Sequence, residues 1–260
     1  ELIKLVDVLM EDFGLPAEEI KVGFSGHRGY HLHVESEEIR TMDSMARKEI
    51  VDYLVGIGLE PSFHGLQLKG EKNSHLLAGP WLDDFGWRGR ITKGTYEFLK
   101  TTTREELEKI GLNKKVVNSI IQNREAILEN WRKKVETWGR IRYVGGESWR
   151  KLFMRGIENQ SIKIDTVVTT DVHRLIRVSN TLHGKTGLKK VEVPLAQIET
   201  FDPLKSAIAF KEGAVTVSVI EVPKFRLGEE TYGPYKGEEV TLPTAAAMLL
   251  LCKGVAKVII

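Results

Sequence analysis

The stretch Lys21–Val34, which reads KVGFSGHRGYHLHV, constrains the fold of this chain more than any other feature of its sequence. Two short runs with the composition of β-strands flank a tight turn that contains two glycines, which is typical of a strand–turn–strand unit. In the second run His31 and His33 lie on one face of the predicted strand, and Leu32 and Val34 lie on the other. The turn also carries a serine, an arginine and a histidine, which a simple change of chain direction does not require.

The composition is that of a globular protein. Hydrophobic residues make up 42% of the 260 residues and charged residues 28%, which fits a folded chain with a substantial core. The net charge is only +2, so an anion site must come from local clustering of cations. A single cysteine, Cys252, excludes an internal disulfide and a multi-cysteine zinc site, and favours an intracellular protein of the cytoplasm or nucleoid. The apolar run at 245–251 is too short to span a bilayer, so no membrane association is expected.

The beginning of the chain is also informative. Residue 1 is a glutamate, and residues 1–13 have the apolar spacing of the middle of an amphipathic helix, with no capping residue before it. We therefore expect the chain to be the downstream part of a longer protein.

The remaining periodicities predict a mixed α/β (α+β) fold. Strands are expected at 20–24, 31–34, 163–169, 207–210, 215–222 and 225–227, with a last strand or tail at 255–260. Helices are expected at 1–13 and 241–251, with a helix or tight turn at 172–178. A further helix is capped by Asp43 or Ser44 and ends at Gly56 and Gly58.

Residues 61–156 differ in character from the rest of the chain. The part from 62 to 90 is rich in glycine and aromatic residues and has no clear period. Thr102 and Glu105 then have the spacing of a capping box, and Asn113 precedes a long helical pattern. We expect a mainly helical insertion at 61–156 between the first part (1–60) and the second part (157–260) of one α/β domain.

Three apolar residues of that insertion invite two interpretations. Trp131, Val135 and Trp138 have the spacing i, i+4, i+7 on a predicted basic helix. They could stack on nucleic-acid bases, but the simpler interpretation is that they form the core of the helical lobe. We adopt the simpler interpretation.

A second unusual stretch runs from Lys163 to Lys190. Between residues 161 and 190 there are six lysines and arginines against two acids. Five of the seven histidines lie either in this stretch or in Lys21–Val34. The two stretches are therefore rich in side chains that bind anions.

Together the two stretches indicate recognition of a polyphosphate. Glycines such as Gly26 let the backbone approach an oxyanion closely, and free amides in such a turn form an anion-binding concavity. Arg28 and Arg177 can each donate paired hydrogen bonds to phosphate oxygens, and Lys185 acts as a point charge. The further candidate donors are Ser25, His27, His31 and His183. Asp165, a carboxylate among these cations, makes most sense as a ligand of a divalent metal that bridges a triphosphate.

Each feature has a simpler interpretation when taken alone. A glycine-rich strand–turn–strand is usually only a hairpin, and Asp165 could pair with Arg174 or Lys163. Asp171 fits a helix N-cap, and His33 fits a structural histidine with its hydrogen bonds satisfied. Phe24 and Tyr30 are most simply packing residues. The occurrence of both stretches in one chain favours the polyphosphate site.

The two stretches also carry a family resemblance. Residues 25–31, SGHRGYH, resemble the S-G-x-R-G-x-H motif of the archaeo-eukaryotic DNA primases. Asp165 lies twelve residues before Arg177 and is followed by HGKTG at 183–187, which resembles that family's third-carboxylate and basic-histidine motif. The chain is most similar to the small catalytic subunit of archaeal type, over residues 1–60 and 155–195.

The resemblance implies a role for each matching residue. Ser25, His27 and Arg28, with the backbone at Gly26, would hold an incoming nucleoside triphosphate, and His31 would support them. Arg177, His183 and Lys185 would hold the same phosphates from the other side. Asp165 would be a catalytic carboxylate and one of three that bind Mg²⁺ or Mn²⁺ in a two-metal nucleotidyl transfer. The family also implies a single-stranded DNA template and a large-subunit partner in a heterodimer.

The sequence departs from the family at the other two carboxylates. These form a D-x-D pair before the serine–glycine motif, and no such pair precedes Ser25. Asp83 and Asp84 are adjacent in sequence, and Glu35 and Glu37 follow the motif instead of preceding it. A zinc knuckle of archaeal members would also lie in that upstream segment, so zinc is expected only there. Truncation explains this departure better than degeneration of the family pattern.

The leading hypothesis is therefore the catalytic small subunit of a DNA primase. As it stands, the chain is expected to bind triphosphate weakly and to catalyse nothing, since one carboxylate cannot hold two metal ions. Two alternatives remain open. One is a primase-polymerase of repair or plasmid type, and the other is a non-catalytic module that binds nucleotide or nucleic acid.

Overall fold

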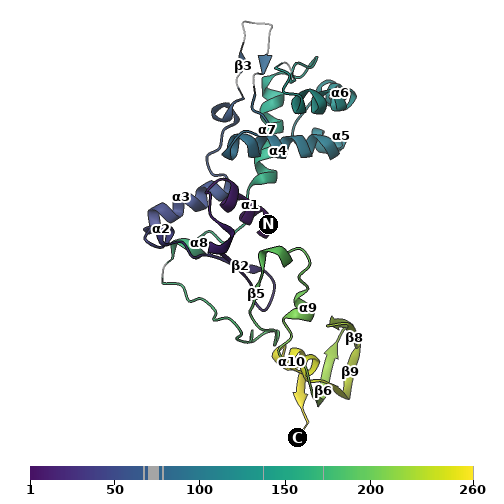
Figure 1. Cartoon of the computed structure of the whole chain (residues 1–260). Coiled ribbons are helices and arrows are strands. Elements are labelled where there is room, and N and C mark those ends of the chain that lie inside the picture. The colour runs from purple at the N-terminus through teal and green to yellow at the C-terminus, as the bar shows by residue number, and fades with distance from the viewer. Residues whose placement is uncertain (67, 70–75, 78, 137, 172, 260) are drawn as a thin grey trace. The chain divides into compact units, whose positions relative to one another are not determined.

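The chain divides into two units, which are described separately. A computed structural model describes residues 1–66, 68–69, 76–77, 79–136, 138–171 and 173–259. The first unit comprises residues 1, 3–14 and 43–170, and the second comprises residues 2, 15–42 and 171–260. Figure 1 labels most of their helices and strands. The predicted boundaries of the helical insertion, at 61 and 156, lie inside the first unit and stay a prediction.

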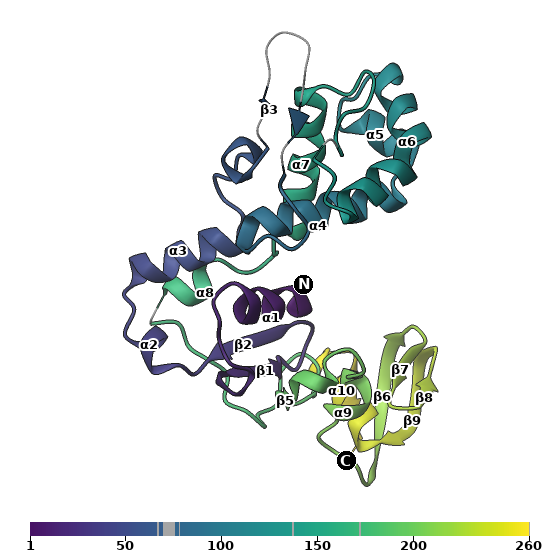
Figure 2. The same ribbon diagram turned by 45° about the horizontal axis from the view of Figure 1, so that its top comes forward.

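The first unit is mainly helical. Its long helices are α1 (Leu2–Glu11), α3 (Ser44–Val55), α4 (Gly86–Thr101), α6 (Lys114–Arg132) and α7 (Gly146–Gln160). Shorter elements are η2 (Pro61–His64), α5 (Arg104–Lys109), α8 (Val167–Thr170) and the paired strands β3 (Leu68–Lys69) and β4 (Leu76–Leu77). Helix α4 packs against α7, as Figure 2 shows. The contact is close because Gly94 has no side chain: a Cβ there would lie 2.4 Å from the carbonyl oxygen of Gly156.

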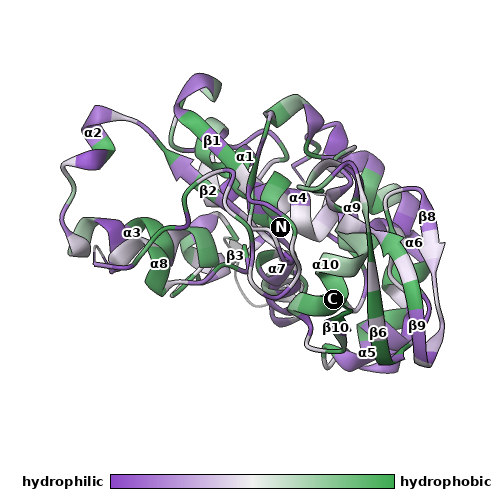
Figure 3. Cartoon of the chain, turned by 90° about the horizontal axis from the view of Figure 1, so that it is seen from below, coloured by the Kyte–Doolittle hydropathy of each residue, from purple (hydrophilic) through white to green (hydrophobic). Residues whose placement is uncertain are grey.

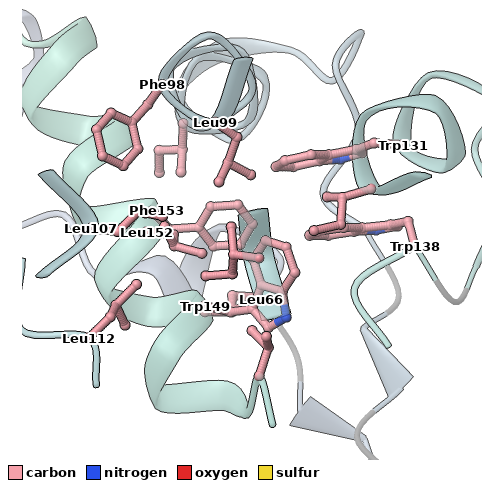
Figure 4. Close-up of a cluster of buried hydrophobic side chains, with 14 of the residues drawn as sticks. Leu66, Phe98, Leu99, Leu107, Leu112, Trp131, Trp138, Trp149, Leu152 and Phe153 are labelled. Carbon is pink, nitrogen blue, oxygen red and sulfur yellow. The ribbon is translucent and has the colours of Figure 1, made fainter. Parts of the chain in front are cut away.

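The core of this unit is aromatic. The indole rings of Trp131 and Trp138 stack face to face with centroids 4.1 Å apart, and Trp149 meets Trp138 edge-on (Figure 4). The interpretation of Trp131 and Trp138 as core residues is confirmed by exposed fractions of 1% and 0%. Their predicted placement on one helix is wrong, because α6 ends at Arg132. Val135 is 37% exposed, so its assignment to the core is also wrong.

A buried ion pair joins α1 to α4. Arg90 donates from Nε to Asp12 Oδ2 at 2.5 Å and from Nη2 to Asp12 Oδ1 at 2.9 Å. Both side chains are buried, and the Tyr53 hydroxyl donates to the same carboxylate at 2.8 Å. Burial, followed by this hydrogen bond, raises the pKa of Tyr53. The network therefore ties α1, α3 and α4 together with paired charges rather than with apolar contacts alone.

The second unit begins with a three-stranded antiparallel sheet. Its strands are β1 (Ile20–Phe24), β2 (Tyr30–Val34) and β5 (Val191–Val193), in the order β2-β1-β5. Phe24 pairs with Tyr30 across the hairpin and with Val191 on the other side of β1. The same unit also contains η1 (Ala17–Glu19), α2 (Glu37–Arg40), η3 (Leu195–Gln197) and α9 (Pro203–Ser206).

The C-terminal part of the second unit holds another antiparallel sheet. Strands β6 (Ala214–Val222), β9 (Tyr235–Pro243) and β10 (Ala256–Val258) pair in the order β10-β6-β9, and β7 (Phe225–Leu227) and β8 (Glu230–Tyr232) form a hairpin. Helix α10 (Thr244–Cys252) packs on β6, β9 and β10. Its sequence is almost entirely apolar, as the hydropathy colours of Figure 3 indicate.

Most predictions from local signals are confirmed. The mixed α/β class holds, and the strands expected at 20–24, 31–34, 215–222 and 225–227 and the helix at 1–13 all form. Asp43 caps α3 by accepting the amide of Ala46 at 2.8 Å, and Gly56 ends that helix with φ +73°. Asn113 caps α6. In the described part of the chain, no helix is long and apolar enough to cross a membrane.

Several predictions are wrong. No strand forms at 163–169, where Asp165 accepts the amide of Val167 and leads into α8. The stretch 207–210 contributes a single bridge, Ile208 to Leu188, and the C-terminal helix begins at Thr244, not at 241. The capping box lies one residue later than predicted, at Thr103 and Glu106. Of the helix or tight turn expected at 172–178, no helix forms at 173–178, but the Arg174 amide donates to the Asp171 carbonyl at 3.2 Å, as in a tight turn. Part of the aperiodic stretch 62–90 lies outside the described residues.

Candidate nucleotide site

The turn between β1 and β2 presents its polar side chains to solvent. The Ser25 amide donates to the carbonyl of Gly29 at 3.0 Å, which closes the turn. Gly26 and Gly29 have φ angles of +88° and +113°, which side chains of L-residues rarely allow. His27, Arg28 and His31 are exposed. The turn is anchored below by Phe24, which is 2% exposed and meets the Tyr30 ring edge-on, so the packing role predicted for both aromatics is confirmed.

The loop His183–Gly187 forms a second tight turn. The His183 carbonyl accepts the amides of Thr186 and Gly187 at 3.1 and 2.9 Å, and the His183 amide donates to Leu188 at 2.8 Å. The Lys185 amide donates to Nδ1 of His183 at 3.2 Å, which orients the imidazole. Because Nδ1 is the acceptor of this bond, the proton of the neutral ring is on Nε2. The Lys185 side chain is exposed.

The fold brings this loop against the first turn. The imidazole rings of His27 and His183 stack with centroids 5.0 Å apart and an angle of 17° between their planes. Thr186 donates from Oγ1 to the carbonyl of Gly26 at 2.5 Å. Gly26 and His27 of the turn therefore contact Thr186 and His183 of the loop, although about 155 residues separate them in sequence. Parts of the two predicted stretches, residues 25–29 and 183–187, therefore lie next to each other.

Arg177 is held beside the same sheet by its backbone and side chain. Its carbonyl accepts from Nζ of Lys190 at 2.7 Å, and its Nη1 donates to the Leu182 carbonyl at 3.1 Å. Lys190 is 5% exposed, which is unusual for a lysine. Arg177 and Lys190 also line a pocket of about 390 Å³ on the sheet. The other residues around the pocket are Lys21, Val22, Gly23, His33, Glu35, Ser179 and Glu192.

The surrounding cations act on the site histidines. Burial lowers the pKa of His183, and the charges of Arg177, His27 and Lys185 lower it further. The residue His31 is exposed as a whole, but partial burial of its imidazole is the first cause that lowers its pKa, followed by Lys190, His33, Arg177 and Arg174. Both imidazoles are therefore neutral near pH 7, and a bound anion would favour their protonation.

His33 differs from its predicted role. Its Nε2 is buried and has no hydrogen-bond partner among the described residues, so it is not the satisfied structural histidine that the sequence suggested. Burial lowers its pKa, with Lys190 acting in the same direction. Sequence inspection also missed Thr186 and Lys190, because a threonine and a lysine in a basic loop carry no signal of burial.

Asp165 belongs to the first unit, whereas the turn and the loop belong to the second. Its side chain is exposed, and Oδ1 accepts the amide of Val167 at 3.3 Å. Among the residues that the structure describes, no group of three or more histidine, cysteine, aspartate or glutamate side chains could hold a metal ion. The described residues therefore do not fit a two-metal centre, whereas the cations and amides of the turn and loop suit a phosphate chain.

Comparison with known proteins decides the family. The family model described as DNA primase small subunit matches residues 1–196. The chain belongs to this family. It is 35% identical to the DNA primase small subunit PriS of Methanothrix thermoacetophila, over 99% of this chain and 69% of that protein. The PriS proteins of Methanococcoides burtonii and Methanocella arvoryzae are 32% and 33% identical, over 99% and 98% of this chain and 68% and 69% of theirs.

The comparison confirms the resemblance drawn from the two motifs. The match of the primase small subunit family includes both the turn at 25–29 and the loop at 183–187. A DNA primase is a nucleotidyltransferase, so an enzyme of this class is the right context for a polyphosphate site. The roles of individual residues stay predictions, and so do the divalent metal and the large-subunit partner.

Proposed function

We propose that this primase small subunit binds the triphosphate of an incoming nucleotide between the turn at 25–29 and the loop at 183–187. The observation that carries the proposal is the stacking of His27 on His183, with centroids 5.0 Å apart, which sets cationic and hydrogen-bonding groups of both segments side by side. Bound there, a nucleoside triphosphate would enter nucleotidyl transfer that makes short primers on a single-stranded DNA template. Membership of the primase small subunit family supports this reaction.

Each side chain of the site has a distinct role in this proposal. Arg28 is exposed and offers paired donors to phosphate oxygens, while Lys185 contributes charge. Ser25 and the amides around Gly26 donate hydrogen bonds from the turn. Arg177, which lines the pocket beside His33 and Lys190, would add a further donor.

The histidines add donors whose charge can change. His27 and His183 can each donate an N–H to phosphate, and His183, whose pKa is lowered in the free protein, can take up a proton when the triphosphate binds. His31 stands next to Gly23 across the β1–β2 ladder and on the same face as His33, where it supports the site.

Asp165 is the one metal ligand that we propose within this chain. Enzymes of this family use divalent cations, and we infer that Asp165 supplies one carboxylate ligand for Mg²⁺ or Mn²⁺. A bound cation would neutralise phosphate charge during transfer. A single carboxylate does not hold two cations, so we expect the 260-residue chain alone to bind triphosphate without making primers.

Binding of ATP to site variants tests the proposal. Arg28→Ala should weaken ATP binding by about tenfold or more, because an arginine–phosphate contact is a charge-assisted, often bidentate hydrogen bond. Arg140→Ala, at an exposed arginine of the first unit, is the matched control and should leave the affinity unchanged. Equal affinities of Arg28→Ala and the unaltered chain, measured by calorimetry, would contradict the proposed site.

Primer synthesis on a single-stranded template tests the expected inactivity of this chain by itself. The unaltered chain, supplied with nucleoside triphosphates and Mn²⁺, is expected to produce no primer. Robust synthesis that survives Asp165→Asn would show that the catalytic metal is held by other residues. Synthesis that Asp165→Asn abolishes would overturn only the expectation that this chain is inactive by itself.

A further inference from the structure

Thr186 is the buried polar residue of the loop at 183–187. Its exposed fraction is 7%, whereas Lys185 beside it is exposed. Its hydroxyl donates to the carbonyl of Gly26 at 2.5 Å and accepts the amide of Leu188 at 3.2 Å. The hydroxyl thus links the loop to the turn and also closes the loop on itself. A buried hydroxyl with both bonds made is well defined in position.

The backbone of the turn packs closely against the loop around this hydrogen bond. A Cβ on Gly26 would lie 2.9 Å from Cβ of His183 and 3.2 Å from the carbonyl oxygen of Leu188. The turn and the loop are therefore in van der Waals contact where Thr186 joins them. In the described part of the chain, the bond from Thr186 is the hydrogen bond that joins residues 25–29 to residues 183–187. Without it the Gly26 carbonyl would face a buried contact without a donor, which favours separation of the two segments.

We infer that Thr186 is a positioning residue of the nucleotide site, which fixes the spacing of the turn and the loop. Its side chain is buried and its hydroxyl is bonded to the backbone, so we do not expect it to touch the ligand. It acts through His183, whose ring stacks on His27 only while the two segments keep this spacing. The inference rests on the proposed function, since a spacing matters only if one anion contacts both segments.

The test compares three threonine variants, with inorganic tripolyphosphate as the ligand. Thr186→Val keeps the shape and removes the hydroxyl, and should weaken binding about tenfold. Thr186→Ser restores the hydroxyl and should recover binding to within about twofold. Thr216→Val is the matched control, since Thr216 shares a 2.9 Å hydroxyl hydrogen bond with Thr241 on the sheet of β6 and β9. Calorimetry at a temperature well below each melting point separates binding from stability.

A double-mutant cycle distinguishes positioning from a general loss of structure. In a His183→Ala background, Thr186→Val should change the affinity by less than about twofold, because the residue through which it acts is gone. Full additivity of the two changes would overturn the inference, as would unaltered binding by Thr186→Val. Absence of tripolyphosphate binding by the unaltered chain would overturn the proposed function itself, whereas loss in Arg28→Ala but not in Thr186→Val would overturn this inference alone.

Discussion

At the scale of single residues, the candidate site combines histidines with permanent cations that lower the pKa of those histidines. Arg177 and Lys185 both lower the pKa of His183, after the effect of burial. The imidazole of His183 is therefore neutral in the free protein. A bound anion would raise its pKa and so favour its protonation. Such a residue donates to phosphate at pH 7 and gains charge only when the ligand compensates for the surrounding cations.

The affinity for triphosphate should therefore increase as the pH falls. His183 and His31 have lowered pKa values, so in the free protein they take up protons only below the ordinary value of 6.5. A bound anion favours the protonated form, which raises both pKa values, and by linkage the binding constant rises as the pH falls through about 7 to 5.5. Calorimetric titrations across this range should show a steeper rise for the unaltered chain than for His183→Gln.

Because the ligand itself also titrates, the effect of His183 is compared with that of a control variant at a histidine outside the site. His64 also has a pKa lowered by burial, but it belongs to the first unit. His64→Gln should keep the pH dependence of the unaltered chain. If His183→Gln and the unaltered chain have the same slope, the imidazole of His183 does not contact the bound anion.

At the scale of secondary-structure elements, local signals fix where helices begin. Asn113 accepts the amide of Val116 at 3.1 Å and caps α6, whose inner face carries the buried Val117 and Ile120. The helix packs in the tryptophan core, so its first turn is coupled to the stability of that unit.

Asn113→Ala should lower the free energy of unfolding by about 1 kcal/mol, because the amide of Val116 loses its side-chain acceptor. Asn113→Asp keeps an acceptor oxygen and should stay within about 0.5 kcal/mol of the unaltered chain. Chemical denaturation followed by tryptophan fluorescence measures both. Equal stabilities of the alanine and aspartate variants would mean that the cap does not limit α6.

The contact between α4 and α7 depends on a missing side chain. A Cβ on Gly156 would lie 2.2 Å from Oγ1 of Thr95 and 2.7 Å from the carbonyl oxygen of Ile91. Gly156→Ala should therefore lower the free energy of unfolding by about 1–3 kcal/mol, although alanine has the higher helix propensity. Gly184→Ala meets no atom within 4 Å and serves as the control. A stabilised Gly156→Ala variant, found by denaturation, would show that the helices can move apart at no cost.

The fold could be predicted from the sequence where local signals decide the structure, and not where contacts between distant segments decide it. The β1 strand and helix α3 follow from an apolar run, the cap at Asp43 and the left-handed Gly56, which all act locally. The β-branched run at 163–169 reads as a strand only if a neighbouring strand pairs with it, and in the fold Asp165 starts a helical turn instead. Strand β9 was missed because its polar residues hide the alternation.

The candidate site shows a similar limit. The residue types of the turn and of the loop could be recognised from their phosphate-binding chemistry. Their contact depends on the hydroxyl of Thr186 and on the absent side chain of Gly26, and no pattern along the chain reveals a hydrogen bond between residues 160 positions apart. The orphaned Nε2 of His33 is likewise a property of packing.

At the scale of the whole molecule, the two units divide the family's motifs. The second unit holds the turn, the loop and Arg177, and the first holds Asp165. Under the proposed function, triphosphate binding would depend on the second unit, and the proposed metal ligand Asp165 lies in the first. The chain should therefore recognise the phosphate tail of a nucleotide whether or not the transfer reaction proceeds.

The most direct test of the central claim is the ratio of the dissociation constants of ATP and AMP, measured by calorimetry on the unaltered chain. If the turn and the loop bind the β- and γ-phosphates, ATP should bind about 100-fold more tightly than AMP. AMP lacks those phosphates and so loses several charge-assisted hydrogen bonds. Arg28→Ala should reduce this ratio while leaving the affinity for AMP nearly constant. Equal affinities for ATP and AMP would contradict the assignment of Ser25–His31 and His183–Lys185 as a triphosphate site.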